Sequence, residues 1–273
     1  MCGRYVMARA TSDLVALGDA EANEELVLRQ SWNVAPTAEV PILVAHADDV
    51  GAGVTRRIHV ARWGLVPPWA KELSVGSRAF NARSETVASK PTFRAAVRAR
   101  RCAVPVEGYY EWKAPEPGAK GPDGRIAKKQ SYYVHPAGAG DGEGPVIWFA
   151  GLYEWWQDPE AKAAGEDAWV LSTTILTMAA PDADDDDPVL AALGQLHDRL
   201  PVPMDAETMD RWLAPDTLGS AEEADALVGQ VCAGAYDVAA GWSLRPVGGA
   251  VGNVRNNGPE LIQEMREQQG TLL

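Results

Sequence analysis

The chain has 273 residues, of which 46% are hydrophobic and 23% are charged; these values suit one large globular domain and exclude a disordered, collagen-like or disulfide-stapled protein. No apolar run approaches the roughly 20 residues of a membrane helix, and no secretory signal opens the chain, so we expect a cytoplasmic protein without membrane contact. The formal net charge of −13 argues against a uniformly cationic surface of the kind that binds nucleic acid.

Alternating and β-branched residues predict many short strands. The two prolines of 64–69 end the second strand, because proline cannot donate to a strand ladder, and they turn this segment into a loop that presents apolar and aromatic side chains. The expected strands cover 41–46, 55–63, 102–106, 109–113, 131–135, 146–153 and 169–177.

Capping residues and proline mark the helix starts. Thr11, Ser12 and Asp13 offer a cap to a short helix. Pro91 stands in the first turn of a helix over 91–101, and the spacing places its arginines on one side; these are Arg94, Arg98 and Arg101. Further short helices are expected near 189–193, 206–213, 222–231 and 259–268.

Polar, Gly- and Pro-rich stretches separate these elements and are short enough to be surface loops; they lie near 114–128, 137–145, 157–167 and 181–188. We expect the five aspartates of 182–187 to face solvent. Strands do not alternate regularly with helices, which disfavours a doubly wound parallel sheet. We therefore predict an α+β fold in a single domain over 1–273, with a β-rich, barrel-like core of mixed and antiparallel strands flanked by short helices.

The charge is unevenly distributed along the chain. Residues 55–113 hold twelve Lys and Arg against four Glu and no Asp, a net charge of +8 that could steer an anion to one face. Of the ten tryptophans, Trp63, Trp69 and Trp112 fall in this basic section. We expect most tryptophans to be core residues, but aromatic faces among arginines also suit single-stranded nucleic acid, where stacking contributes about 1–3 kcal/mol per base.

Three widely spaced cysteines, Cys2, Cys102 and Cys232, form neither a disulfide framework nor a zinc pattern, so we expect no metal and no cofactor. Removal of Met1 would leave the α-amine and the thiol of Cys2 on adjacent carbons. With ordinary pKa values of about 8 and about 8.5, both would be partly unprotonated near neutral pH. Such an aminothiol captures an aldehyde as a Schiff base and then as a five-membered thiazolidine. The same residue could also attack an amide, or be inert at a frayed terminus.

Three polar segments are candidates for further chemistry. Asn81 and Arg83 combine an amide with a planar fork suited to phosphate, although a turn with helix caps explains their segment equally well. Alternation places Glu111 on the same strand face as Tyr109, where aromatic neighbours would desolvate it for proton transfer; a paired carboxylate at a strand edge is the simpler alternative. His197 suits a proton shuttle or a structural role.

Seven sequence blocks follow one another from Cys2 to about Gln263: MCGRY at 1–5, WNVAP at 32–36, WGLVPPW at 63–69, NARSET at 81–86, GYYEW at 108–112, HDRLP at 197–201 and VGNVRN at 251–256. In this combination and order they resemble the SOS-response-associated peptidase (SRAP) family, the abasic-site processing proteins. The resemblance implies a covalent sensor of abasic sites in single-stranded DNA, in which Cys2 forms a thiazolidine cross-link that shields the site during the DNA damage response.

The resemblance also assigns roles to residues around Cys2. Glu111 would act as the general acid–base, His197 would assist opening of the sugar ring, and Asn81 would hold a hydroxyl or the bound aminothiol. Positions that match the family's DNA-binding residues are Arg4, Arg83 and Arg199 for phosphates, and Pro36 and Trp69 for the flanking bases. The implied partner is single-stranded DNA with an abasic site, and we expect a monomer that joins the nucleoid when bound to DNA.

Two other functions remain open from the sequence. A cysteine peptidase with an N-terminal nucleophile would use the same Cys2 and Glu111, on other substrates or only to remove Met1. A passive single-strand binder would need neither residue.

Overall fold

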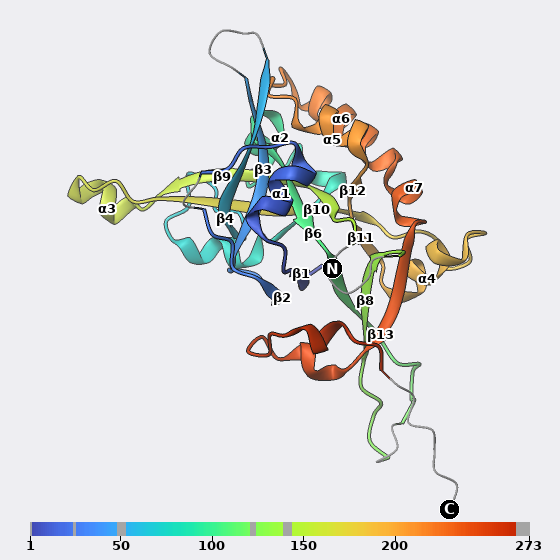
Figure 1. Ribbon diagram of the computed structural model, residues 1–273. Coiled ribbons are helices and arrows are strands. Elements are labelled where there is room, and N and C mark those ends of the chain that lie inside the picture. The colour runs from blue at the N-terminus through green and yellow to red at the C-terminus, as the bar shows by residue number, and fades with distance from the viewer. Residues whose placement is uncertain (1, 24–25, 48–52, 121–123, 139–143, 266–273) are drawn as a thin grey trace, which may run out of the picture.

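The computed structural model describes residues 2–23, 26–47, 53–120, 124–138 and 144–265. Five strands at its centre close on themselves into a mixed barrel (Figure 1). β3 pairs with β4 and β6, β9 pairs with β6 and β10, and a parallel pairing of β10 with β4 closes the ring. These strands are β3 (Glu39–Ala47), β4 (Val54–Trp63), β6 (Arg101–Val106), β9 (Ile147–Gln157) and β10 (Trp169–Ala179).

A second, five-stranded sheet packs beside the barrel and carries the start of the chain. Its order is β13–β8–β7–β1–β2, with every pairing antiparallel. The strands are β1 (Tyr5–Met7), β2 (Ser31–Val34), β7 (Gly108–Lys113), β8 (Gln130–Pro136) and β13 (Trp242–Val247). β1 lies between β2 and β7, and Cys2, three residues before β1, is buried.

Three short strands extend the barrel at its edges. β5 (Asn81–Arg83) runs parallel to β10, β11 (Arg199–Pro201) runs antiparallel to β10, and β12 (Pro203–Met204) pairs with β9. The residues of β5 and β11 therefore meet at the far end of β10, around Thr177, which pairs with both Arg83 and Pro201.

Helices cover the outside of the two sheets. α4 packs on β7 and β13, α5 on β6, and α6 on α2 and α5, so that α4 to α7 line one side of the molecule in Figure 1. The helices are α1 (Thr11–Gly18), α2 (Arg94–Ala99), α3 (Pro159–Ala164), α4 (Pro188–Leu196), α5 (Ala206–Leu213), α6 (Ala221–Ala233) and α7 (Ala235–Ala239). Within the described ranges, no helix is both long and apolar enough to cross a bilayer.

The predicted α+β single domain with a barrel-like core is confirmed, and each predicted strand is present. The cap expected at the first helix is wrong: the helix begins at Thr11, whose hydroxyl donates instead to the carbonyl of Leu26. The helix expected at 259–268 is also wrong over its described part, because a single 3-10 turn over Pro259–Ile262 ends before Glu264 bridges to Val247. Residues 266–268 lie outside the described residues.

Two of the predicted loops contain ordered structure. The segment 157–167 includes α3, which Asp158 caps by accepting from the backbone N–H of Glu160. In 181–188, Asp187 caps α4, while Asp182, Asp184 and Asp186 are exposed as expected. The predicted loops 114–128 and 137–145 lie partly outside the described residues.

The arginine stripe predicted for the helix over 91–101 is wrong at its end. α2 stops at Ala99, and Arg101 is the first residue of β6, where it is only 5% exposed. Its guanidinium donates to five backbone carbonyls, those of Val97, Arg98, Trp212, Ala214 and Asp216. Arg101 therefore joins the end of α2 to the segment that follows α5.

We expect Arg101→Met to lower the free energy of unfolding by about 3 kcal/mol, because buried carbonyls lose a charged donor and are left without partners. Urea denaturation measures this change. The exposed Arg94 is the matched control, and Arg94→Met should change stability by no more than about 0.5 kcal/mol. Equal stabilities of the two variants would contradict the role given to Arg101.

Candidate active site

Cys2 lies three residues before β1 and is buried, with 1% of its surface exposed. Burial, and next the charge of Glu111, raise the pKa of its thiol well above the ordinary value. With Met1 present, the thiol is therefore harder to ionise than an ordinary cysteine thiol. The sulfur is protonated near neutral pH and needs a base before it can act as a nucleophile. Met1 lies outside the described residues.

Asn81 fixes the backbone of Cys2. Its Nδ2 donates to the Cys2 carbonyl oxygen at 2.8 Å, across 79 residues of sequence. The parallel pairing of β5 with β10, which sets Asn81 opposite Ile175, positions the amide. Within the described part of the chain, the buried Oδ1 of Asn81 has no hydrogen-bond partner. This oxygen is available to accept from an amine or a hydroxyl beside Cys2.

Glu111 is the carboxylate whose charge acts on the Cys2 thiol. It lies on β7 and is 6% exposed, and the backbone N–H of Trp112 donates to its Oε1 at 3.2 Å. Its charge also contributes, after burial and Cys2, to raising the pKa of Tyr109. Alternation along β7 predicted this shared face, and the structure confirms it: Tyr110 packs into a separate cluster with Trp112.

Tyr5, three residues after Cys2, carries a further polar group. Its ring is fully buried against Trp63, with centroids 4.9 Å apart, and burial and then the charge of Cys2 raise the pKa of its hydroxyl. In the described residues the hydroxyl has no hydrogen-bond partner. Sequence reasoning missed Tyr5, although its place in the block that contains Cys2 was a usable signal.

His197 follows the last turn of α4, which packs on β7. Its Nδ1 accepts from the backbone N–H of Arg199 at 3.0 Å and lies 2.7 Å from Oδ1 of Asp198. These contacts orient the ring through Nδ1. The ring of His197 is partly open to solvent.

Two of the predicted phosphate-binding arginines already have protein partners. Arg4 donates through one nitrogen to Oδ1 of Asn33 at 3.0 Å and to the carbonyl of Val251 at 2.8 Å, which ties three of the seven sequence blocks together. Arg199 makes a bidentate pair with Glu85 at 2.6 and 2.9 Å, and this contact holds the pKa of Glu85 below its usual range. Much of the charge of Arg199 is therefore offset.

The remaining predicted DNA-binding residues lie at the surface. Arg83 is exposed on β5, two residues from Asn81, and its side chain makes no hydrogen bond or ion pair within the described chain. Trp69 is 62% exposed, and Pro36 is half-buried in the turn after β2. Next to Pro36, Thr37 adopts φ = 78°, a strained conformation for a β-branched residue.

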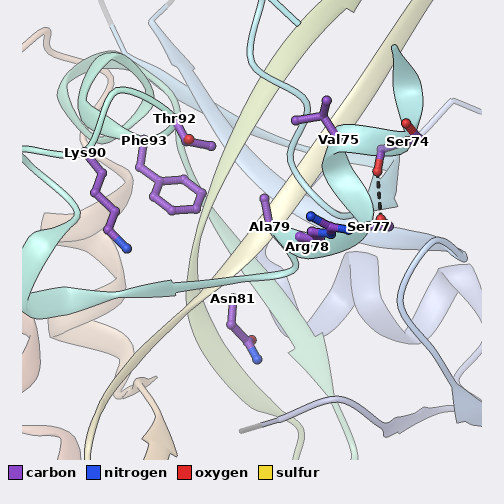
Figure 2. Close-up of a pocket in the computed structure, with 9 residues that line it drawn as sticks. All are labelled: Ser74, Val75, Ser77, Arg78, Ala79, Asn81, Lys90, Thr92 and Phe93. Atoms are coloured by element: carbon purple, nitrogen blue, oxygen red, sulfur yellow. Dashed lines mark hydrogen bonds between the residues drawn. The ribbon is translucent and has the colours of Figure 1, made fainter.

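A pocket of about 580 Å³ opens beside Asn81 (Figure 2). Figure 2 shows Asn81 at one end of it, between the 3-10 helix η1 (Leu73–Arg78) and residues 90–93. The lining includes the exposed cations Arg78 and Lys90 and no carboxylate. Sequence reasoning placed both cations in the basic section but did not assign them to a site. Among the described residues, no three His, Cys, Asp or Glu side chains gather to hold a metal ion.

The close approach of two glycines sets one wall of this pocket. Gly64 has φ = 133°, and a Cβ on either Gly64 or Gly76 would meet the other's carbonyl oxygen within 2.4 Å. Only glycine at both positions lets the chain fold back so that η1 lies against the end of β4.

The model of the SOS response associated peptidase (SRAP) family matches residues 1–254, and the chain belongs to this family.

Relatives with known names come from both bacteria and animals. The chain is 31% identical over 264 residues to "Abasic site processing protein YoqW" of Bacillus subtilis, which covers 96% of this chain and 99% of that protein. It is 26% identical over 258 residues to "Abasic site processing protein HMCES" of Rattus norvegicus, covering 85% of this chain and 64% of that one. A crystal structure of a Bacteroides thetaiotaomicron protein shares the fold, with a TM-score of 0.68, 20% identity and coverage of 97% and 100%.

Proposed function

We propose that this protein recognises abasic sites in single-stranded DNA and forms a covalent cross-link to them through Cys2 after Met1 has been removed. The observation that carries the proposal is the setting of Cys2: Asn81 holds its carbonyl, the charge of Glu111 acts on its thiol, and a cation-lined pocket opens at Asn81. The names of the relatives, abasic site processing proteins, supply the substrate class.

The chemistry follows from the atoms at the site. An abasic deoxyribose opens to an aldehyde, with which the α-amine of Cys2 condenses to a Schiff base and releases one water. The Cys2 thiol then gives its proton to Glu111, and the sulfur adds to the imine carbon while the nitrogen takes up a proton. The product is a five-membered thiazolidine that joins the protein and the sugar.

The ring protects the strand better than an imine alone. A Schiff base draws electrons from the neighbouring carbon and promotes β-elimination of the phosphate, which would cut the DNA. Addition of sulfur removes this electron sink. Because the raised pKa keeps the Cys2 thiol protonated, we assign the proton transfer that starts this second step to Glu111.

The remaining site residues have supporting roles in this proposal. Oδ1 of Asn81 accepts from the amine of Cys2 or a sugar hydroxyl, and His197 assists opening of the sugar ring. Arg83, Arg78 and Lys90 offer exposed positive charge to the phosphates at this end of β10. Such contacts do not read bases, so binding should be largely independent of sequence.

The test is a denaturing gel of the wild-type protein incubated with abasic single-stranded DNA, with intact DNA and with casein. We expect a shifted band with abasic DNA only, and its loss in Cys2→Ser. Cleavage of casein without a shifted band would instead support a cysteine peptidase. Binding that survives Cys2→Ser and never withstands denaturation would support a passive binder.

Arg83→Ala should weaken non-covalent binding by a similar factor for all DNA sequences, because a phosphate contact is lost. The slope of log affinity against log salt concentration should fall by about 1. Fluorescence anisotropy over a salt series measures both changes. A loss confined to one sequence, or an unchanged slope, would contradict a phosphate contact at Arg83.

A further inference from the structure

Three exposed tryptophans gather around a second pocket, of about 310 Å³, that the chemistry at Cys2 does not use. Trp69 is 62% exposed, Trp155 is 44% exposed and Trp169 is 53% exposed. Large aromatic side chains are seldom left in water without a function, and here three of them line one concave site together with Pro68 and Pro159.

The β9–β10 hairpin explains how two of these rings come together. Trp169 pairs with Gln157 and Leu171 pairs with Trp155, so Trp155 and Trp169 are diagonal neighbours on one face of the hairpin. Trp156 points to the opposite face, where it is buried and its Nε1 donates to the carbonyl of Ala70 at 2.8 Å. This bond fixes the loop that carries Trp69 against the hairpin.

The charged residues that line the second pocket are both lysines. Lys71 and Lys162 line the pocket, and no carboxylate does. The acidic residues near the hairpin tip lie outside the lining, and Asp158 is engaged in capping α3. Aromatic faces combined with lysines are the features that hold single-stranded nucleic acid, since bases stack on the rings while the cations meet the phosphates.

The second pocket and the pocket beside Asn81 are lined by neighbouring segments of the chain. Residues 68–71 line the tryptophan pocket, and residues 74, 75, 77–79 and 81 line the pocket beside Asn81. The segment between them is held at both ends, by the Trp156 bond to Ala70 and by the backbone bond from Leu65 to Ala79 at 3.1 Å. The two linings are therefore joined by one short segment that contains η1.

We propose that Trp69, Trp155 and Trp169, with Lys71 and Lys162, form a base-stacking subsite for the unpaired DNA that flanks the abasic nucleotide. The inference rests on the proposed function, because that function makes single-stranded DNA the ligand. The subsite adds affinity for longer strands and takes no part in the covalent step.

The experiment measures non-covalent affinity by anisotropy, in a Cys2→Ser background, for oligonucleotides of increasing length without an abasic site. We expect Trp155→Leu/Trp169→Leu to weaken binding of long oligonucleotides by at least about tenfold, and to leave the shortest ones unaffected. Trp155→Phe/Trp169→Phe is the matched control and should retain most of the affinity, because it keeps aromatic faces. Both positions are exposed, so thermal unfolding should be unchanged.

Equal affinity of the Leu variant and the parent protein for every length would overturn the subsite. A second result would also overturn it: the parent protein self-associates in analytical ultracentrifugation, and the Leu variant is monomeric with unchanged DNA affinity. The rings would then form an interface between copies of the chain. The covalent reaction is tested separately. With Cys2 present and DNA saturating, the Leu variant should give the full yield of cross-link, so failure of the subsite and failure of the cross-linking function are distinguishable.

Discussion

A protein that retains any residue ahead of Cys2 will form no cross-link with abasic DNA. Both bonds of the thiazolidine come from Cys2, and a peptide bond to a preceding residue removes the lone pair that the amine needs to attack the aldehyde. An N-terminal tag that prevents removal of Met1 should therefore reduce the shifted band on a denaturing gel below detection. Non-covalent binding measured by anisotropy should change little, because Arg83, Arg78 and Lys90 are untouched.

The matched control is the same tag joined to Cys2 through a protease site that leaves Cys2 first after cleavage. Cleavage should restore the cross-link to the level of the untagged protein. A tagged protein that cross-links as well as the untagged one would rule out the α-amine as the attacking group.

Glu111→Gln should slow cross-link formation by about 10²–10⁴-fold, which is the usual contribution of a positioned general base. Glutamine keeps the shape of the side chain but cannot take the proton from the thiol. The charge of Glu111 raises the pKa of Cys2, so its removal also lowers that pKa and increases the fraction of thiolate. The two effects have opposite signs, which makes the variant informative.

If Glu111 acts only through its charge, Glu111→Gln will react as fast as the wild type or faster. If it carries the proton, the variant will be slow even though its thiol is easier to ionise. Quench-flow measurement of cross-link formation gives the rate, and alkylation with iodoacetamide as a function of pH gives the thiol pKa. Glu107→Gln is the control in the same segment, because Glu107 contacts Arg9 and the backbone of Ala8 rather than Cys2, and its rate should be unchanged.

Local pattern was sufficient for most elements of the fold. Strand alternation placed Tyr109 and Glu111 on one face of β7, and the residue pattern of 206–213 matches the bounds of α5. Local pattern failed where contacts with residues distant in sequence determine the structure. Arg101 reads as one more residue of a basic helix, but five carbonyls around it place it at the start of β6.

The same distinction holds for the candidate site. Their own chemistry made Cys2 and Glu111 candidates, and only the seven sequence blocks together assigned roles to them and to Asn81. The bond from Asn81 to the Cys2 carbonyl depends on the parallel pairing of β5 with β10. The pairing of Arg199 with Glu85 and the gathering of three tryptophans at one pocket also join segments far apart in sequence. No local periodicity contains that information.

Mass spectrometry of the cross-linked protein tests the central claim most directly. The adduct is trimmed with nuclease, denatured and treated with iodoacetamide before its intact mass is measured. A thiazolidine predicts a protein without Met1, joined to the sugar fragment with loss of one water, and carrying two alkyl groups, on Cys102 and Cys232. An adduct that still contains Met1, or that takes up three alkyl groups because the sulfur of Cys2 is free, would contradict it.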